Sequence, residues 1–319
     1  MENCTKVNKP RAHVFKAKHI AVLRQADRFY GYKKNRQDPA SVRLNRKFAR
    51  EADSFPYSAR PYNIVAMFRG RRQKIERLDF ILVGAQKSGT TALHYFLSKH
   101  PNITMGDQQE IHFFDDDAKF VSGANYEQLH KHYPLLAPST IAGDCTPSYI
   151  YYEPVAERIW KYNPKIKLLI ILRNPVDRAF AHWNMQRFKG REPLDFFDAV
   201  REEQARIAGA PATEARRFAY VDRGFYSRQL ARLFKFFPRE QVKVVKFEKF
   251  REQQRETLAS IFSFLGCKPL RSVRSKDRNV VPYERAMNWE ERIFLYNLFA
   301  KDIANVEQML RWDCSDWKL

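Results

Sequence analysis

The stretch FILVGAQKSGTTALHYFL (residues 80–97) decides the fold of this chain. Its strand-like run FILV ends at Gly84, a loop of small residues follows, and an apolar pattern suited to a helix comes next. Nucleotide-hydrolysing loops have glycine, four residues, then Gly-Lys-Ser/Thr, with the lysine on the outer phosphates. Gly84 and Gly89 keep that spacing, but Thr90 stands where the lysine would be, and the lysine is Lys87. The pattern therefore disfavours ATP hydrolysis.

The same loop has the chemistry of an anion site. Backbone N–H groups of a glycine-containing turn at a helix N-terminus form an anion cradle, and the helix dipole strengthens it. Lys87 adds a full positive charge, while Thr90 and Thr91 add hydroxyl donors. A plain structural glycine turn is the alternative. We consider the anion-binding loop the better interpretation.

A second segment, RNPVDRAFAHWNM, starts at Arg173 and directly follows the run KLLIIL (167–172). A continuous apolar run is typical of a strand buried on both faces of a parallel sheet. Arg173 then stands at the carboxyl end of a strand, where open α/β sheets bind ligands, and its planar fork suits a phosphate. The local alternative is that Asn174 and Pro175 only start a helix and that the charges after them lie on the surface.

The remaining sequence alternates strand-like and helix-like segments, which predicts an α/β fold. We expect a P-loop-like, three-layer fold with a central parallel β-sheet flanked by helices. The expected strands are 78–83, 140–143, 167–172 and 241–247, and the expected helices are 90–99, 176–188, 193–208, 228–236, 255–265 and 289–310.

Positive charge is concentrated at the N-terminus. Residues 1–77 hold 20 Lys/Arg against 6 Asp/Glu, a net charge of +14 out of +21 for the 319-residue chain. Such a segment is either a solvated arm or a contact surface for a polyanion, a membrane surface or an acidic partner. Because aromatic residues are interleaved with the charges, we predict a basic extension (1–77) that packs partly on a domain at 78–319. No sequence motif indicates specific binding of nucleic acid.

Cysteine usage and hydropathy bear on the compartment. Cys4, Cys145, Cys267 and Cys314 show no metal-ligand spacing, so reduced thiols are the favoured interpretation, with a Cys267–Cys314 bridge left open. No run approaches the ~20 apolar residues of a membrane span, and the basic N-terminus lacks the apolar core of a secretory signal. The sequence therefore predicts a cytoplasmic protein without a transmembrane segment, and it does not indicate an oligomeric state.

Together, GAQKSGTTAL and LRNPVDRAFAHW resemble the two nucleotide-binding motifs of the sulfotransferases that use 3′-phosphoadenosine 5′-phosphosulfate (PAPS). That family transfers a sulfuryl group to a hydroxyl or an amine and releases 3′-phosphoadenosine 5′-phosphate (PAP). QEIHFFDDD (109–117) resembles the KE-x-HFFD stretch of carbohydrate sulfotransferases related to the heparan sulfate enzymes. SKDR (275–278) resembles their later nucleotide loop, SKGR. The resemblance covers the chain from about residue 78 onward.

The resemblance implies a role for each nucleotide-binding position. Lys87 would contact the oxygen that bridges sulfur and the 5′-phosphate. Arg173 would hold the 3′-phosphate, and Lys276 and Arg278 would close over the nucleotide. The residues implied to surround the 5′-phosphate are Ser88, Gly89, Thr90 and Thr91.

It also implies a catalytic base. Glu110 aligns with the carboxylate that takes the acceptor's proton, and His112 is a second polar group beside it. Burial among Ile111, Phe113 and Phe114 would raise the pKa of that carboxylate toward neutrality. Without the resemblance, a loop-surface carboxylate would be the simpler interpretation. The transferred sulfuryl group carries less charge than a phosphoryl group, so a lysine and backbone dipoles can suffice and no metal is expected.

Three positions depart from the family pattern. Ala181 replaces a serine that donates to the 3′-phosphate, Cys145 replaces a lysine near the acceptor in heparan-type enzymes, and Asp277 replaces the glycine of SKGR. The acceptor is consequently open between a carbohydrate, including an anionic glycan, and a small molecule. A protein that binds PAP or a polyanion with little turnover, and a P-loop kinase, remain as alternative functions.

Overall fold

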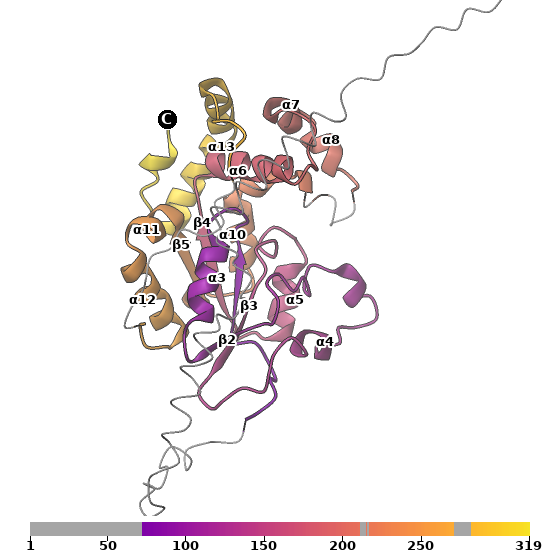
Figure 1. Ribbon diagram of the computed structural model, residues 1–319, viewed down its shortest axis with the longest axis vertical. Coiled ribbons are helices and arrows are strands. Elements are labelled where there is room, and N and C mark those ends of the chain that lie inside the picture. The colour runs from indigo at the N-terminus through magenta and orange to yellow at the C-terminus, as the bar shows by residue number, and fades with distance from the viewer. Residues whose placement is uncertain (1–71, 211–214, 216, 271–281) are drawn as a thin grey trace, which may run out of the picture. The chain divides into compact units, whose positions relative to one another are not determined.

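The computed structural model describes residues 72–210, 215, 217–270 and 282–319. The predictions for residues 1–71 and for Lys276, Asp277 and Arg278 lie outside the described residues. Five parallel strands form one sheet with the order β2-β3-β1-β4-β5 (Figure 1). The strands are β1 (Phe80–Gly84), β2 (Ile103–Met105), β3 (Ile141–Cys145), β4 (Lys167–Leu172) and β5 (Val242–Lys246).

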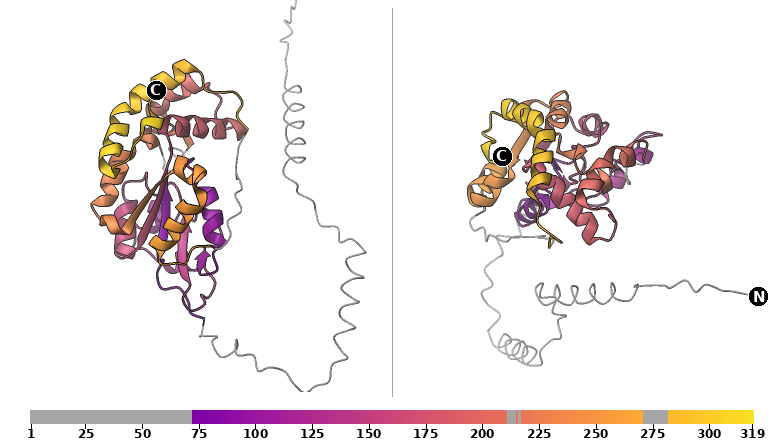
Figure 2. Two further views of the ribbon diagram at one scale, coloured as in Figure 1. Left: turned by 90° about the vertical axis from the view of Figure 1, so that its left-hand side faces the viewer. Right: turned by 90° about the horizontal axis from the view of Figure 1, so that it is seen from above.

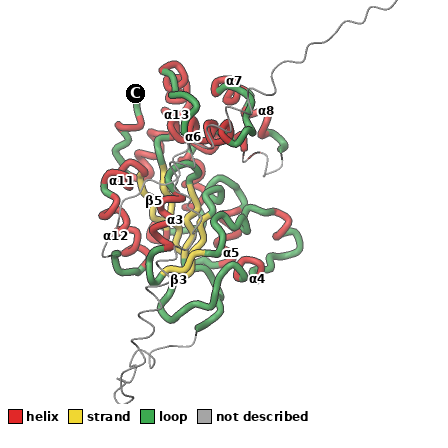
Figure 3. The backbone as a smooth tube through the Cα atoms, viewed as in Figure 1, coloured by secondary structure: helices red, strands yellow, loops and turns green. Residues whose placement is uncertain are grey.

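Helices border the strands on both sides (Figure 3). The longest is the last helix, which has the predicted bounds. The α-helices are α3 (Thr90–Ser98), α4 (Glu127–His130), α5 (Val155–Tyr162), α6 (Pro175–Phe188), α7 (Phe196–Arg201), α8 (Glu203–Ile207), α10 (Tyr226–Phe234), α11 (Phe247–Glu252), α12 (Gln254–Leu265) and α13 (Trp289–Leu310).

The central strands separate two apolar cores. Phe80 and Leu82 of β1 face the core that contains the apolar residues of α3 and α12. Ile81 and Val83 face the opposite core, which contains those of α5, α6, α10 and α13. Successive side chains of a strand point to opposite faces, so a strand buried on both faces must be apolar throughout. The three-layer architecture with a parallel sheet is thus confirmed (Figure 2).

The sequence missed some elements and misjudged one. The predicted helix 193–208 is wrong as one helix, because the chain forms α7 and α8 with a break at Glu202. There the buried carboxylate of Glu203 accepts the backbone N–H groups of Val221 and Asp222, each at 2.7 Å. Strand β2 and helices α4, α5 and α11 were not predicted. They are short, so their local patterns carry little signal.

Cys145, Cys267 and Cys314 are free thiols, so the bridge left open by the sequence is not formed. Burial raises the pKa of the Cys145 thiol well above its ordinary value. None of the helices in the described parts of the chain is long and apolar enough to cross a membrane.

Candidate active site

The loop between β1 and α3 lies at the carboxyl edge of the sheet. Its start is tied to β4, because the N–H of Ala85 donates to the carbonyl of Ile171 at 2.8 Å. Gly89 is the N-cap of α3 and has a φ of 94°, in the left-handed region that favours glycine. A Cβ at Gly89 would lie 2.9 Å from the ring of Phe247. Glycine is therefore required here for both its conformation and its size.

The first turn of α3 presents free backbone donors. Among the described residues, no side chain caps this helix and no acidic residue occupies its first turn. Its N-terminal N–H groups and its dipole are consequently available to an anion. Ser88 and Thr90 are buried against the loop, and Thr91 accepts a hydrogen bond from the side chain of Gln109 at 3.4 Å.

Lys87 and Arg173 are brought together, as the sequence predicted. Arg173 Nη1 donates to the carbonyl of Lys87 at 3.5 Å, and the hydroxyl of Tyr226 donates to the carbonyl of Arg173 at 2.9 Å. Burial, followed by the positive charges of Arg173, Lys189 and Arg178, lowers the pKa of Lys87 to about 8. The charged ammonium is thus held in surroundings that already carry excess positive charge.

This cationic region fits an anionic ligand. Arg178 is fully buried, and its Nη2 donates to the carbonyl of Tyr220. Its Nε and Nη1 have no hydrogen-bond partner within the described part of the chain. Buried donors without partners are costly, and like charges at close range repel. A negatively charged group beside the loop would relieve the repulsion.

Glu110 and His112 form the second half of the site. The N–H of Glu110 donates to the carbonyl of Cys145 at the end of β3 (3.0 Å), and His112 Nε2 lies 3.5 Å from Glu110 Oε2. The Glu110 side chain is 43% exposed, whereas Ile111, Phe113 and Phe114 are buried. The expected burial of this carboxylate is therefore wrong, because its apolar neighbours face the core rather than the carboxylate.

Asp115 and Ser148 complete this group, and the sequence analysis did not identify them. His112 Nδ1 lies 3.0 Å from Asp115 Oδ2, and Ser148 Oγ donates to the same carboxylate at 2.6 Å. The Asp115 side chain has no exposed surface. A carboxylate can only accept, so it keeps the proton of His112 on Nδ1 and leaves Nε2 directed at Glu110.

The only sequence signal for this role was ambiguous. HFFDDD contains three consecutive aspartates, and only folding separates them. Asp116 caps a short 3-10 helix through the N–H of Ala118, and Asp117 pairs with Arg158 at 2.6 Å. The third, Asp115, points inward to the histidine.

Comparison with known proteins identifies the family. The family model described as the sulfotransferase domain matches residues 77–284. The chain belongs to the sulfotransferase domain family. Residues 1–71 lie outside the described structure, so the boundary predicted between residues 77 and 78 stays a prediction.

Relatives of known activity are similar over the same region. Human heparan sulfate glucosamine 3-O-sulfotransferase 5 is 33% identical over 189 residues, which cover 59% of this chain and 53% of that protein. Bovine bifunctional heparan sulfate N-deacetylase/N-sulfotransferase 2 is 29% identical over 196 residues, covering 60% of this chain and 22% of that protein. The chain thus spans about half the length of the first relative and less of the second.

A crystal structure of a sulfotransferase from Alicyclobacillus acidocaldarius is similar over more of the chain. Its TM-score is 0.63 and its sequence identity 30%, and the match covers 76% of this chain and 99% of that one. The loop between β1 and α3, Arg173 and Glu110 all lie within the matched family region.

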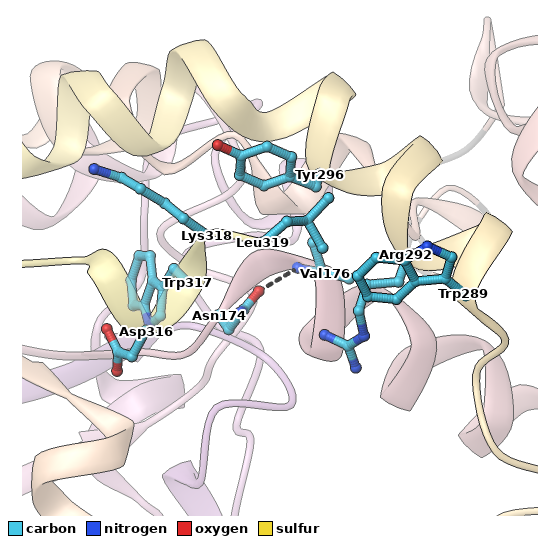
Figure 4. Close-up of a pocket in the computed structure, with 9 residues that line it drawn as sticks. All are labelled: Asn174, Val176, Trp289, Arg292, Tyr296, Asp316, Trp317, Lys318 and Leu319. Atoms are coloured by element: carbon cyan, nitrogen blue, oxygen red, sulfur yellow. Dashed lines mark hydrogen bonds between the residues drawn. The ribbon is translucent and has the colours of Figure 1, made fainter.

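A cavity of about 230 Å³ adjoins the site of this sulfotransferase at the start of α6 (Figure 4). Asn174 lies on its wall, directly after Arg173, and its side chain accepts the N–H of Val176 at 3.0 Å. Arg292 also lines the cavity and pairs with Asp177 at 3.0 Å. Ala181, the departure from the second motif, is buried on the same helix.

A buried carboxylate lies beneath the Glu110 half of the site. Burial raises the pKa of Asp144 to about 6, against hydrogen bonds from the Thr146 hydroxyl and the Cys145 N–H. Its field also acts on the adjoining Cys145 thiol, whose proton is thereby held more tightly. Cys145 consequently stands near Glu110 as a neutral group, not as a cation.

Proposed function

We propose that this sulfotransferase moves a sulfuryl group from PAPS to a hydroxyl or amine of a carbohydrate or small-molecule acceptor by in-line displacement. One observation carries the proposal. Gln109 contacts Thr91 at the start of α3, so the Glu110–His112–Asp115 group adjoins the anion-binding loop. A loop that holds a leaving group and a base beside it are the two parts that sulfuryl transfer needs.

The loop half would bind and orient the donor. The N–H groups at the start of α3 and the Lys87 ammonium would surround the 5′-phosphosulfate, and Lys87 would neutralise the charge that develops on the leaving oxygen. Arg173 would hold the 3′-phosphate, for which its planar guanidinium is suited. Lys276 and Arg278 remain proposed contacts to the nucleotide, outside the described residues. Fixing both ends of the donor aligns it for in-line attack.

The carboxylate half would move a proton. Glu110 Oε2 would accept the proton of the acceptor hydroxyl or amine as the new bond to sulfur forms. His112 Nε2, 3.5 Å away, would share that proton, and Asp115 would stabilise the imidazolium through Nδ1. Base strength at Glu110 would thus come from a polar network rather than from apolar burial.

Carbohydrate acceptors are supported by the names of the relatives, which act on heparan sulfate. Cys145 weakens the extension to heparan-like chains, because a neutral thiol stands where the resemblance places a lysine. The cytoplasmic location expected from the sequence stays a prediction. So does the absence of a metal requirement, which rests on the Lys87 chemistry described above.

Incubation with labelled PAPS and a panel of carbohydrate and small-molecule acceptors tests the proposal directly. We expect sulfate in the product of at least one acceptor. In parallel, PAP should raise the melting temperature by mass action, and ATP should not. A shift by ATP equal to that by PAP, or a shift that needs Mg²⁺, would instead support a P-loop kinase. Tight PAP binding with no product from any acceptor would favour a binding protein.

A further inference from the structure

Phe247 is the first residue after β5 and the first residue of α11. Strands β1, β4 and β5 are neighbours in the sheet, so the residues that follow them meet at one edge (Figure 1). The loop with Gly89 follows β1, and Arg173 follows β4. Phe247 therefore stands beside both groups that we assign to the nucleotide's phosphates.

The ring of Phe247 contacts both of these groups. Its edge comes within 2.9 Å of the point where a Cβ of Gly89 would lie, so it packs directly against the N-cap of α3. The guanidinium carbon of Arg173 lies 5.3 Å from its ring centroid, within the range of a cation–π interaction. One half-buried ring thus joins the loop to the arginine.

The other contacts of the Arg173 guanidinium are weaker in orientation. Its hydrogen bond to the Lys87 carbonyl is long, at 3.5 Å, and the Tyr226 hydroxyl fixes only the Arg173 backbone. A flexible arginine with few fixed contacts loses rotamer entropy when it binds a ligand. An aromatic face that holds the guanidinium in advance reduces this loss.

We propose that Phe247 is a positioning residue: it holds the Arg173 guanidinium at a set distance from the phosphate loop and thereby selects nucleotides that carry a 3′-phosphate as well as a 5′-phosphate. The proposal rests on the proposed function, because it assigns the 3′-phosphate to Arg173. It goes beyond it by naming the residue that makes the second phosphate favourable.

The test compares two nucleotides in calorimetric titrations of the full chain. PAP carries both phosphates and adenosine 5′-phosphate carries one, so the ratio of their affinities isolates the contribution of the 3′-phosphate. Phe247→Leu keeps an apolar side chain but removes the aromatic face. We expect it to lower the PAP preference by about 3- to 10-fold, as loss of a cation–π contact implies, while the affinity for adenosine 5′-phosphate stays unchanged. Phe247→Tyr is the matched control and should keep the wild-type ratio.

Two results would overturn the proposal. In one, Phe247→Leu leaves the affinity ratio unchanged. In the other, the variant weakens both nucleotides equally, which would make Phe247 a support of the loop alone. If Phe247→Leu does not fold, Phe247→Met replaces it with the same expected ratio and the same two refuting results.

A double-mutant cycle adds an independent readout. Arg173→Lys alone should lower the PAP preference, but in the Phe247→Leu background it should lower it less, because the coupling is already lost. Additive effects would refute the coupling. If the wild-type protein binds neither nucleotide, the proposed function itself fails. If the wild type prefers PAP and the ratio survives in Phe247→Leu, only this inference fails.

Discussion

Lys87 should make the affinity for the donor nucleotide depend on pH. Its pKa is lowered to about 8 by burial and by the cations Arg173, Lys189 and Arg178. In the ligand-free protein, its charged fraction therefore falls from about nine-tenths at about pH 7 to about one-tenth at about pH 9. A bound phosphate supplies the negative charge that the site lacks, and so raises the pKa of Lys87.

The size of the effect follows from this titration. If PAP binds only the charged ammonium, its apparent affinity is constant well below the free-protein pKa and falls as pH rises through it. Between about pH 7 and about pH 9 the loss is about 10-fold, and binding takes up close to one proton at the upper end. The expected change is thus weaker binding in alkaline solution, not in acid.

Calorimetric titration of PAP at several pH values measures the affinity, and buffers of different ionisation enthalpy report the proton uptake. Lys87→Arg is the control, because arginine keeps its charge throughout this range. It shares the titration of the ligand's own phosphates, which lies near about pH 6. PAP affinity that is flat from about pH 7 to about pH 9 in the wild type would refute the reasoning, as would an equal slope in Lys87→Arg.

The remaining predictions concern the base, the loop and the extension. Glu110→Gln should lower turnover by roughly 10²–10⁴ with PAP affinity unchanged, measured by sulfate transfer and titration, and Asp115→Asn should cause a smaller loss with an altered pH–rate profile. Near-normal turnover in Glu110→Gln would move the base to His112. Gly89→Ala should lower stability by about 1–3 kcal/mol in thermal unfolding and abolish PAP binding, because it combines a positive φ with a 2.9 Å contact to Phe247. Gly123→Ala is its control, since Gly123 has a φ of +90° and nothing within 4 Å of its Cβ position. Deleting residues 1–50 should raise the acceptor KM and reduce its salt dependence while PAPS affinity is kept, because exposed charges are screened within about 10 Å at 0.1 M salt. An unchanged KM at low and high salt would show that the extension does not steer the acceptor.

Local patterns were sufficient for the central strands and the last helix. KLLIIL of β4 is apolar throughout because both of its faces are covered, and the predicted bounds match. The bounds of α13 match as well, and Asn288 and Glu291 form a capping box at its start. Such signals depend on residues that are close in the sequence, so a single sequence contains them. The same holds for the two phosphate motifs, each of which follows its own strand.

The side chains that come together across strands could not be found in that way. Asp115 and Ser148 meet His112 only because the segment after β2 crosses the end of β3. The contact of Phe247 with Gly89 exists because β4 alone separates β1 from β5.

By itself, the sequence determined the layers of this sulfotransferase and the two motifs that mark its carboxyl edge. The tertiary structure alone decided which aspartate of HFFDDD faces the histidine and that the Glu110 carboxylate is exposed. Hydrophobic periodicity records whether a residue is buried, and says nothing of which strand lies next to it. Strand order sets the neighbours of each side chain, and packing of the whole chain settles that order.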